Sequence, residues 1–326
     1  MNNKKLCTII IPCYNMQDFL NKCLDSIYQN KESEKYLDVL IIDDGSTDNT
    51  IKIANKYLKK HNNISIYSKP NGHWGSVINY VKHNKLINTK YAFILDADDR
   101  ISKKFTNLLV NVVDPLNVDL GIFKTKILYK NSVVVNPRWL SKKQKTFLPM
   151  IIPCSTIFKT DIFYKSVDLV EKVPYQDYVL YSWMYLNSTN VQFLPHTIGT
   201  YWYSRPNNTM SSSWNDKRVS GEKTLLNELK KLNLEHLFLA RIVLPGYIKG
   251  LSKANIKIAF NKEKVDLLLK NASIFFKLVF RINLKRAKRY NVIKWTKDKV
   301  DIIFLRFPLS RENTQFSAAI FFYKKI

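Results

Sequence analysis

The sequence is short of glycine, proline, cysteine and acidic side chains. Its 326 residues include 8 glycines, 11 prolines and 4 cysteines, and 26 Asp and Glu residues stand against 52 Lys and Arg residues. Apolar residues make up 46% of the chain and aromatic residues 13%, so the chain can bury a sizeable core. This excludes disordered, collagen-like and low-complexity architectures. The length predicts two domains, or one large α/β domain with an appendage.

Disulfide, zinc-finger and transmembrane patterns are also missing. The cysteines are Cys7, Cys13, Cys23 and Cys154. They show neither CxxC pairing nor histidines at zinc-finger spacing, so we expect buried, reduced thiols of a cytosolic protein. The most apolar stretch, residues 272–282, is interrupted by Lys277 and Arg281, whereas a transmembrane helix needs about 18 apolar residues. The apolar run at the N-terminus is too short and too β-branched for a signal peptide.

Positive charge is concentrated in the last third of the chain. Residues 217–326 hold 25 basic and 8 acidic side chains, against 27 and 18 in residues 1–216. A surface this basic indicates a polyanionic partner, either phospholipid headgroups or nucleic acid. A compositional bias toward Lys and Asn accounts for part of the excess.

Three short runs in the first hundred residues are β-branched and almost continuously apolar. They are Leu6–Ile11, Leu37–Ile42 and Tyr91–Leu95. Strands that are buried on both faces have this composition, which is typical of a parallel sheet covered by helices.

Helical patterns lie between the predicted strands. Apolar residues recur at helical spacing in residues 19–27 and 74–81, and a third helix is predicted over residues 48–60, capped by Ser46 or Thr47. This alternation of strand and helix predicts a doubly wound α/β domain.

Polar residues follow each predicted strand. The three strand-end segments are Pro12–Asn15, Asp43–Ser46 and Asp96–Asp99. Ligands of such sheets bind beyond the carboxyl ends of the strands, so five aspartates are expected on one rim. Carboxylates this close repel each other, which calls for a divalent cation or a hydrogen-bonding ligand. The chain has neither GxGxxG nor GxxxxGKS/T, which excludes the usual dinucleotide and NTPase sites.

Four motifs in order resemble those of the family 2 glycosyltransferases, which are inverting enzymes of GT-A fold with nucleotide-sugar donors. The motifs are Thr8–Asn15, Ile41–Asp48, Asn71–Asn79 and Phe93–Asp99. The resemblance covers about residues 5–210. It implies a GT-A nucleotide-sugar-binding domain in residues 1–215, with a mostly parallel sheet flanked by helices.

The resemblance also implies roles for the strand-end residues. Pro12 and Tyr14 would line the nucleobase pocket, Asp44 would accept a hydrogen bond from the uracil ring, and Asp96 would lie near the ribose. Asp98 belongs to the DxD motif, which would hold Mn²⁺ or Mg²⁺ on the diphosphate. A hard cation suits this task because it stabilises the negative charge of the departing nucleoside diphosphate.

One position departs from the family pattern. Ile78 stands where many relatives carry an arginine just before the residue that corresponds to Asn79. A basic contact to the donor is therefore missing from this position, and His73 is the substitute that we consider.

A predicted helix after residue 175 carries the candidate catalytic base. Val179, Leu180, Trp183 and Leu186 recur at helical spacing and place Asp177 in the first turn. Relatives usually have Glu-Asp here, with the Asp as base, and Gln176 replaces the Glu. A carboxylate beside a sugar hydroxyl can act as a general base. The alternative is an Asp that only stabilises the start of a helix through the macrodipole.

The segment Tyr201–Arg205 resembles the Tyr/Arg segment that closes the domain in this family. Two roles are open for Arg205. It could neutralise the leaving diphosphate, or it could form a surface ion pair with Asp177 or Asp216.

Residues 216–326 are predicted to form a mainly helical, basic C-terminal region without a catalytic motif. Aromatic and basic residues interleave within residues 273–290. This pattern fits docking on an anionic membrane surface, or an amphipathic helix that packs on the transferase domain with a solvated basic face. Membrane docking would make the protein cytoplasmic and peripheral at the inner face of the cell membrane.

The expected activity is inverting, metal-dependent glycosyl transfer from a UDP-sugar. The acceptor would be a hydroxyl of a glycan or of a lipid-linked or protein-linked molecule in bacterial cell-surface polysaccharide or glycoconjugate synthesis. A nucleotidyltransferase is one alternative, but it normally needs a Gly-rich basic loop where this chain has Pro12–Asn15. A basic nucleic-acid-binding protein is another. Because the chain has no RNP, zinc-finger or helix-turn-helix signature, we expect no nucleic-acid partner.

Overall fold

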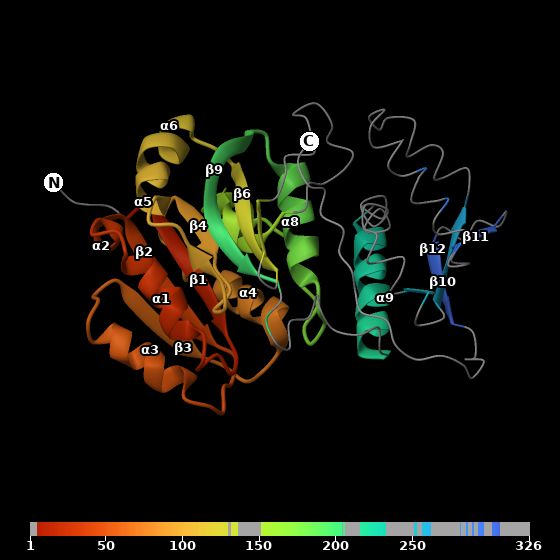
Figure 1. Ribbon diagram of the computed structural model, residues 1–326, viewed down its shortest axis with the longest axis horizontal. Helices are drawn as coiled ribbons and strands as arrows, with labels where there is room; N and C mark the ends of the chain where they lie inside the picture. The colour runs from red at the N-terminus through yellow and green to blue at the C-terminus, as the bar shows by residue number, and fades with distance from the viewer. Residues whose placement is uncertain are drawn as a thin grey trace. The chain divides into compact units, whose positions relative to one another are not determined.

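A computed structural model defines the fold. It describes residues 5–129, 132–135, 151–203, 205, 216–232, 251–252, 256–261, 281, 285, 289, 293–296 and 302–306. The chain forms two compact units, the first from residues 1–139 and 149–211, and the second from residues 140–148 and 212–326. Figure 1 shows the elements of both units.

The first unit is built on a mixed sheet in which nine strands are described. Their order is β3-β2-β1-β4-β8-β6-β9-β5, with β7 paired to β6. The strands are β1 (Cys7–Cys13), β2 (Leu37–Asp43), β3 (Ile64–Ser68), β4 (Tyr91–Ile94), β5 (Arg100–Ile101), β6 (Leu120–Tyr129), β7 (Ser132–Val135), β8 (Thr156–Lys159) and β9 (Val191–Trp202). Strands β3, β2, β1 and β4 are parallel, and β8 runs antiparallel to both β4 and β6. Strand β6 is parallel to β9.

Helices connect these strands (Figure 1). They are α1 (Leu20–Tyr28), α2 (Ser33–Tyr36), α3 (Thr50–Leu58), α4 (His73–His83), α5 (Phe105–Leu108), a π-helical turn at Leu109–Val113, α6 (Asp114–Leu116), a 3₁₀ turn at Pro153–Ser155, α7 (Thr160–Tyr164) and α8 (Gln176–Asn187). Helix α1 contacts α3, while α4 and α7 contact α8.

The core lies on both faces of the sheet because its central strands have no polar face. Ile9 and Ile11 of β1 pack with Leu20 and Leu24 of α1 in one buried cluster. Ile10 is equally buried, and it points to the opposite face because successive side chains of a strand alternate. Helix α4, which contacts β1, covers that face.

The predicted elements of the first unit are confirmed, with one local correction. Strands β1, β2 and β4 and helices α1, α4 and α8 lie where the apolar patterns indicate. Helix α3 begins only at Thr50, and the prediction that Ser46 or Thr47 caps it is wrong. The Ser46 hydroxyl instead accepts the backbone N–H of Asn15 at 3.0 Å, and Asp48 accepts the N–H of Thr50 at 2.9 Å.

The second unit contains a helix within the region predicted to be mainly helical, and it also contains a small sheet. Helix α9 spans Asp216–Lys231 and buries Leu225, Leu226 and Leu229. Three strands, β10 (Ile256–Asn261), β11 (Ile293–Thr296) and β12 (Ile302–Arg306), pair in the order β11-β10-β12. The helical pattern did not predict this sheet, although apolar residues alternate along β10.

Two further expectations concern cysteines and membrane spans. All four cysteines are buried and free, as predicted. No helix in the described part of the chain is long and apolar enough to cross a membrane. Of the stretch 273–290, only Arg281, Lys285 and Arg289 lie among the described residues, and all three are exposed.

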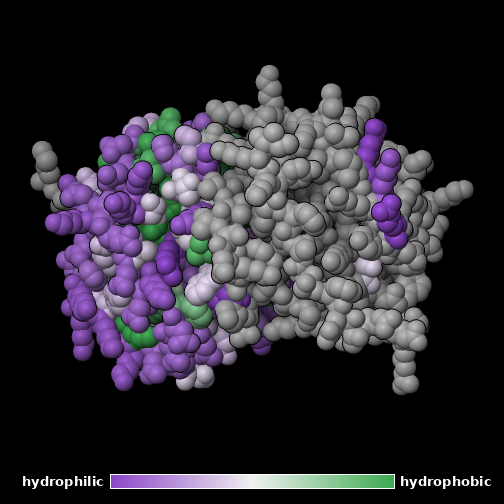
Figure 2. Space-filling model, in the orientation of Figure 1, coloured by the Kyte–Doolittle hydropathy of each residue, from purple (hydrophilic) through white to green (hydrophobic). Residues whose placement is uncertain are grey.

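The visible surface of the described residues is largely hydrophilic, with small apolar areas (Figure 2). Among these residues, the large apolar or aromatic side chains that are notably exposed are Tyr14, Leu58, Tyr67 and Leu116. Tyr14 is the one that directly follows a central strand of the sheet.

Candidate active site

The carboxyl ends of β2, β1 and β4 form one rim. Strand β1 lies between the other two, and Cys13 at its end pairs with Asp43 at the end of β2. The N–H of Asp44 donates to the carbonyl of Cys13 at 2.7 Å, and the N–H of Leu95 donates to the carbonyl of Ile10 at 2.9 Å. The three strand-end segments are therefore neighbours in space.

The first segment offers an aromatic ring to solvent. Tyr14 is 46% exposed, and Pro12 before it is half-buried. The next residue, Asn15, is fixed by two hydrogen bonds to the neighbouring loop, because its N–H donates to the Ser46 hydroxyl and its side-chain oxygen accepts the N–H of Thr47. The exposed ring of Tyr14, next to this anchored residue, can stack on a planar base.

Both carboxylates of the second segment accept hydrogen bonds from other groups of the protein. Both oxygens of Asp43 accept the N–H of Ser46, at 3.1 and 3.3 Å. Asp44 is almost fully buried, and its Oδ1 accepts from Lys69 Nζ at 2.7 Å and from the N–H of Gly72 at 3.0 Å. The positive charge of Lys69 compensates the buried carboxylate.

The third segment crowds three carboxylates together. Asp96 Oδ1 accepts the indole N–H of Trp74 at 3.0 Å. Burial and the nearby charges of Asp98 and Asp177 raise the pKa of Asp96 to about 7, against the lowering effects of the Trp74 hydrogen bond and of Arg205. The raised pKa shows that negative charge is costly at this position.

Asp98 forms an ion pair with Arg205, with 2.5 Å between Asp98 Oδ2 and Arg205 Nε. The guanidinium also lies over the ring of Phe19, with its central carbon 5.3 Å from the ring centre. Asp98 is thus an ion-pair partner of Arg205 that the sequence analysis did not consider. Both members of the pair are largely shielded from water.

Asp99 is 1% exposed, so its carboxyl group lies in the interior. Its Oδ1 accepts the N–H of Trp202 at 3.1 Å, and the buried thiol of Cys154 also lies against the carboxylate. Burial and the charges of Asp98 and Asp96 raise the pKa of Asp99 well above its ordinary value. Asp99 therefore joins β4 to the end of β9 rather than facing a ligand.

Helix α8 brings Asp177 to the same group of carboxylates. The helix begins after Tyr175, whose φ of 67° turns the chain into it, and Asp177 lies in the first turn as predicted. Gln176, which stands where relatives usually have Glu, is buried. Its Oε1 accepts the N–H of Val170 at 2.8 Å and so links α8 to the preceding loop. The charge of Asp177 is one of the influences that raise the pKa of Asp96, so Asp177 acts on the same group of carboxylates.

The position that departs from the family pattern is closed to a ligand. Ile78 is buried, and the neighbouring Asn79 exchanges two hydrogen bonds of 2.9 Å with the backbone of Leu169. His73 is exposed and has a φ of 66° at the start of α4. Among the described residues, Lys69 and Arg205 are the cations that form ion pairs with the rim aspartates.

Sequence reasoning missed Lys69 and Trp74. The side chain of each contacts one of the predicted aspartates, but neither residue belongs to a sequence motif that indicates a functional site. The available signal was the turn sequence Pro70–Gly72 after β3, which returns the chain to the rim.

A metal site made by the protein alone is not found. Within the described ranges, no group of three or more His, Cys, Asp or Glu side chains is placed to hold a metal ion. The crowded carboxylates Asp96 and Asp98 nevertheless fit a cation that takes one or two protein ligands and completes its shell with phosphate oxygens and water. The raised pKa of Asp96 is the observation that favours such a counter-charge.

Comparisons with known proteins identify the family and the fold. The family described as "Glycosyl transferase family 2" matches residues 8–189. An uncharacterized glycosyltransferase of Mycoplasma pneumoniae is 34% identical over 264 residues, which cover 78% of this chain and 88% of that protein.

Two solved structures share the fold. The crystal structure of S. aureus TarS with UDP-GlcNAc superposes with a TM-score of 0.58 at 17% identity, covering 87% of this chain and 81% of that one. The mannosyltransferase PcManGT of Pyrobaculum calidifontis, with GDP-Man and Mn²⁺, gives a TM-score of 0.54 at 13% identity, covering 89% and 86%.

Proposed function

Because the chain belongs to glycosyl transferase family 2, whose members use nucleotide-sugar donors, we propose that it transfers a sugar from a UDP-sugar with inversion and with the help of Mn²⁺ or Mg²⁺. The acceptor is a hydroxyl of a glycan, lipid-linked or protein-linked molecule in bacterial cell-surface polysaccharide or glycoconjugate synthesis. The observation that carries the proposal is the group of Asp96, Asp98 and Asp177 at the rim that also bears Tyr14 and Asp44.

The nucleoside is assigned to the side of the rim formed by β1 and β2. The exposed ring of Tyr14 suits stacking on a base, with Pro12 beside it. Asp44 suits a uracil N–H because a carboxylate only accepts hydrogen bonds. Asp96 is assigned to the ribose hydroxyls. The TarS structure holds UDP-GlcNAc, which supports a uridine nucleotide for this chain.

The cation is assigned to Asp98, with Asp96 beside it. When bound, it neutralises the diphosphate and stabilises the charge that the leaving nucleoside diphosphate gains. In the structure described, Arg205 supplies the counter-charge of Asp98. A donor diphosphate offers Arg205 a second anionic partner, so we assign Arg205 to the leaving group.

Asp177 is assigned the role of general base. It lies in the first turn of α8, near Asp96 but on a different element from the proposed nucleoside contacts. A carboxylate there can take the proton from an acceptor hydroxyl while that oxygen attacks the anomeric carbon. A single in-line displacement of this kind inverts the anomeric configuration.

Donor hydrolysis and transfer assays test this proposal. UDP-glucose, UDP-galactose, UDP-GlcNAc and GDP-mannose are compared in Mn²⁺, in Mg²⁺ and with a chelator, and NMR reports the anomer first released. We expect turnover of a UDP-sugar that needs the metal and gives the inverted anomer. Turnover that survives the chelator unchanged, or that retains configuration, would contradict the proposal.

A pair of carboxylate variants sharpens the assay. Asp98→Ala should lower metal-dependent turnover by about 10²–10³-fold, because it removes a charge that acts in the transition state. Asp161→Ala is the matched control, since Asp161 is an exposed carboxylate in the first turn of α7. Equal activity of the two variants would remove Asp98 from the site.

We also propose a catalytic domain in residues 1–215 and a membrane-docking region in residues 216–326, which places the protein at the inner face of the cell membrane. Arg281, Lys285 and Arg289 support docking because all three are basic, exposed and in helical conformation. Each basic side chain near an anionic surface contributes about 1 kcal/mol.

Vesicle sedimentation of the full chain tests the docking. Changing Arg281, Lys285 and Arg289 together to Glu should abolish pelleting with phosphatidylglycerol vesicles. The same change at Lys56, Lys59 and Lys60 of the first unit should leave it intact. Undiminished pelleting of the first variant would count against this region as the docking surface.

A further inference from the structure

The segment of residues 69–74 connects β3 to α4 and contacts two of the aspartates assigned to the donor. Lys69 and Gly72 contact Asp44, while Trp74 contacts Asp96. The two aspartates follow different strands, β2 and β4, with β1 between them. One short segment therefore reaches carboxylates on both sides of the central strand.

The segment is held firmly enough to orient what it contacts. The N–H of Lys69 donates to the carbonyl of Asp43 at 2.9 Å, and the side chain of Asn71 donates to the carbonyl of Asp44 at 3.0 Å. On its other side, the carbonyl of Gly72 accepts the N–H of Lys172 at 2.8 Å. It is thus anchored both to the end of β2 and to the loop that precedes α8.

Close packing leaves this segment little freedom. A Cβ atom on Gly72 would lie 2.3 Å from the hydroxyl of Ser76, so only glycine fits there without a shift. A Cβ atom on Gly45, which has a φ of +76°, would lie 3.1 Å from the backbone nitrogen of Asn71. Gly45 therefore lets the turn after β2 approach the segment, and Gly72 lets the segment approach the first turn of α4.

The hydrogen bonds on the two aspartates share one feature. Both donors to the Asp44 carboxylate reach Oδ1, and Trp74 also reaches Oδ1 of Asp96. No donor in the described part of the chain reaches the Oδ2 of either side chain. Because one oxygen is fixed, the direction of the second is fixed as well.

We propose that residues 69–74 form a positioning segment for the donor nucleoside. Lys69, with Gly72, orients the free oxygen of Asp44 toward the imino N–H of the base. Trp74 orients the free oxygen of Asp96 toward a ribose hydroxyl. The inference rests on the proposed function, since it takes the ligand to be a uridine nucleotide.

Lys69 and Trp74 are accordingly specificity determinants that do not touch the reacting atoms. Lys69 makes Asp44 selective for a base that presents an N–H, and so disfavours a cytosine, whose ring nitrogen at that position is an acceptor. Trp74 makes Asp96 selective for a nucleotide with its ribose hydroxyls intact. Each residue should affect discrimination between ligands more than turnover.

Calorimetric binding of UDP and three analogues in Mn²⁺ tests the proposal. The analogues are UDP methylated at N3 of uracil, 2′-deoxy-UDP and 3′-deoxy-UDP. The wild type should bind the N3-methyl analogue and one deoxy analogue about tenfold more weakly than UDP, because each lacks one hydrogen bond to a carboxylate.

Two variants separate the two halves of the segment. Lys69→Met should bind UDP about tenfold more weakly than the wild type. It should bind the N3-methyl analogue as well as it binds UDP, and it should still bind the deoxy analogue more weakly. Trp74→Phe, which removes the indole N–H but keeps an aromatic ring, should show the converse pattern. Lys69→Arg retains the charge and should keep the discrimination. Lys69→Gln, which also removes the charge, replaces Lys69→Met if that variant does not fold.

The outcomes are distinguishable. If each variant weakens UDP and all analogues by the same factor, the segment supports the fold only and the inference is overturned. If the wild type binds UDP but discriminates against none of the analogues, the inference fails while the proposed function stands. If the wild type binds no uridine nucleotide, the proposed function fails with it.

Discussion

Aspartates at the two edges of the large sheet have opposite surroundings. At the carboxyl edge, burial and mutual repulsion raise the pKa values of Asp96 and Asp99. At the amino edge, Asp119 precedes β6, and its burial is outweighed by hydrogen bonds from Lys159, Asn190 and Thr189, which lower its pKa well below the ordinary value. The same residue type is thus destabilised at one edge and stabilised at the other.

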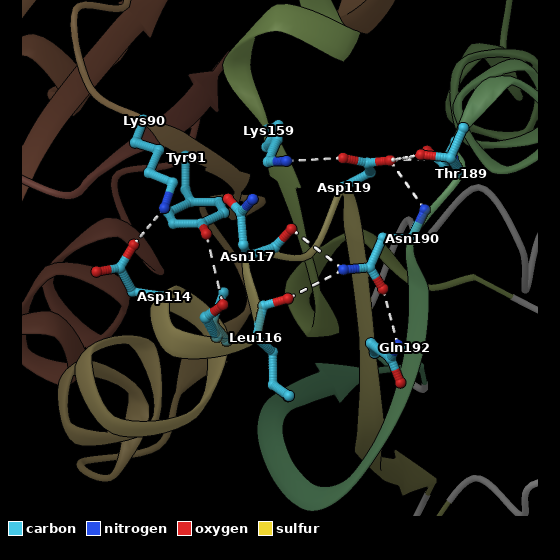
Figure 3. A network of polar contacts seen from close by, with 12 residues as sticks. Lys90, Tyr91, Asp114, Leu116, Asn117, Asp119, Lys159, Thr189, Asn190 and Gln192 are labelled. Atoms are coloured by element: carbon cyan, nitrogen blue, oxygen red, sulfur yellow. Dashed lines mark hydrogen bonds and ion pairs between the residues drawn. The ribbon is translucent and has the colours of Figure 1, made fainter.

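The amino edge has a complete set of partners for its carboxylate (Figure 3). Asp119 Oδ1 accepts from Lys159 Nζ at 2.9 Å. Its Oδ2 accepts from the hydroxyl of Thr189 at 2.7 Å and from the N–H groups of Thr189 and Asn190 at 2.9 Å. The network joins the starts of β6 and β9 to the end of β8. We therefore expect it to stabilise the fold.

The carboxyl edge lacks this balance of charge. Asp96 has one donor within the described residues, and Asp98 has one arginine. Carboxylates whose negative charge is only partly compensated by the protein are therefore a better indication of a ligand site than a carboxylate with a full set of donors. Four variants test this comparison.

The largest effect is expected at the proposed base. Asp177→Asn keeps the shape of the side chain but cannot accept a proton at neutral pH. We expect turnover to fall by about 10²–10⁴-fold while the Kd for UDP stays near that of the wild type. Turnover within a few-fold of the wild type would remove Asp177 from the mechanism.

Asp119→Asn should give the largest change in stability. The substitution leaves Lys159 without its carboxylate and sets an amide N–H₂ against other donors. The free energy of unfolding, measured by urea titration, should fall by about 3 kcal/mol. Donor hydrolysis at a temperature where the variant is folded should be unchanged, and a specific loss of activity would contradict the division between the two edges.

The stability gap between the wild type and Asp119→Asn should depend on pH. The folded pKa of Asp119 lies below the unfolded value of about 4, so its contribution is complete above that pH. The contribution is lost as the pH falls through the folded pKa. Urea titrations should therefore show a constant gap near neutral pH that narrows below about pH 4.

Asp99→Asn should raise the free energy of unfolding, whereas Asp119→Asn lowers it. The amide still accepts the N–H of Trp202, but it removes the cost of burying a carboxyl group beside the charges of Asp96 and Asp98. We expect the free energy of unfolding to rise by about 1 kcal/mol. A loss of more than this amount would show that the charge of Asp99 supports the fold.

The smallest effect is expected at an exposed ion pair of the amino edge. Lys90 and Asp114 approach to 2.6 Å, but both side chains are substantially exposed. Lys90→Met should change the free energy of unfolding by less than about 0.5 kcal/mol, because water and salt screen such pairs. A change comparable to that of Asp119→Asn would show that proximity alone, without burial, determines stability at this edge.

The central part of the fold and the location of the candidate site were predictable from the sequence. The apolar runs of β1, β2 and β4 have no polar face, so they had to lie in a covered parallel sheet. The polar residues after those strands then had to share one rim. The helix that carries Asp177 was predictable because its apolar residues recur at helical spacing.

The small sheet of the second unit was not predicted. Its strand β10 has an alternating pattern, but the surrounding residues gave a stronger helical signal. Strand pairing depends on partners that are distant in the sequence, such as β12 for β10, and a local pattern does not identify them.

The sequence by itself determined which residue types stand at the ends of the central strands, because strand periodicity and strand-end position are local properties. Only the tertiary structure decided which partner each charge has: Lys69 for Asp44, Trp74 for Asp96 and Arg205 for Asp98. The reason is physical. Hydrogen bonds and ion pairs depend on distances of a few ångströms between segments 22 to 107 residues apart in the chain, and those distances arise only when the sheet assembles.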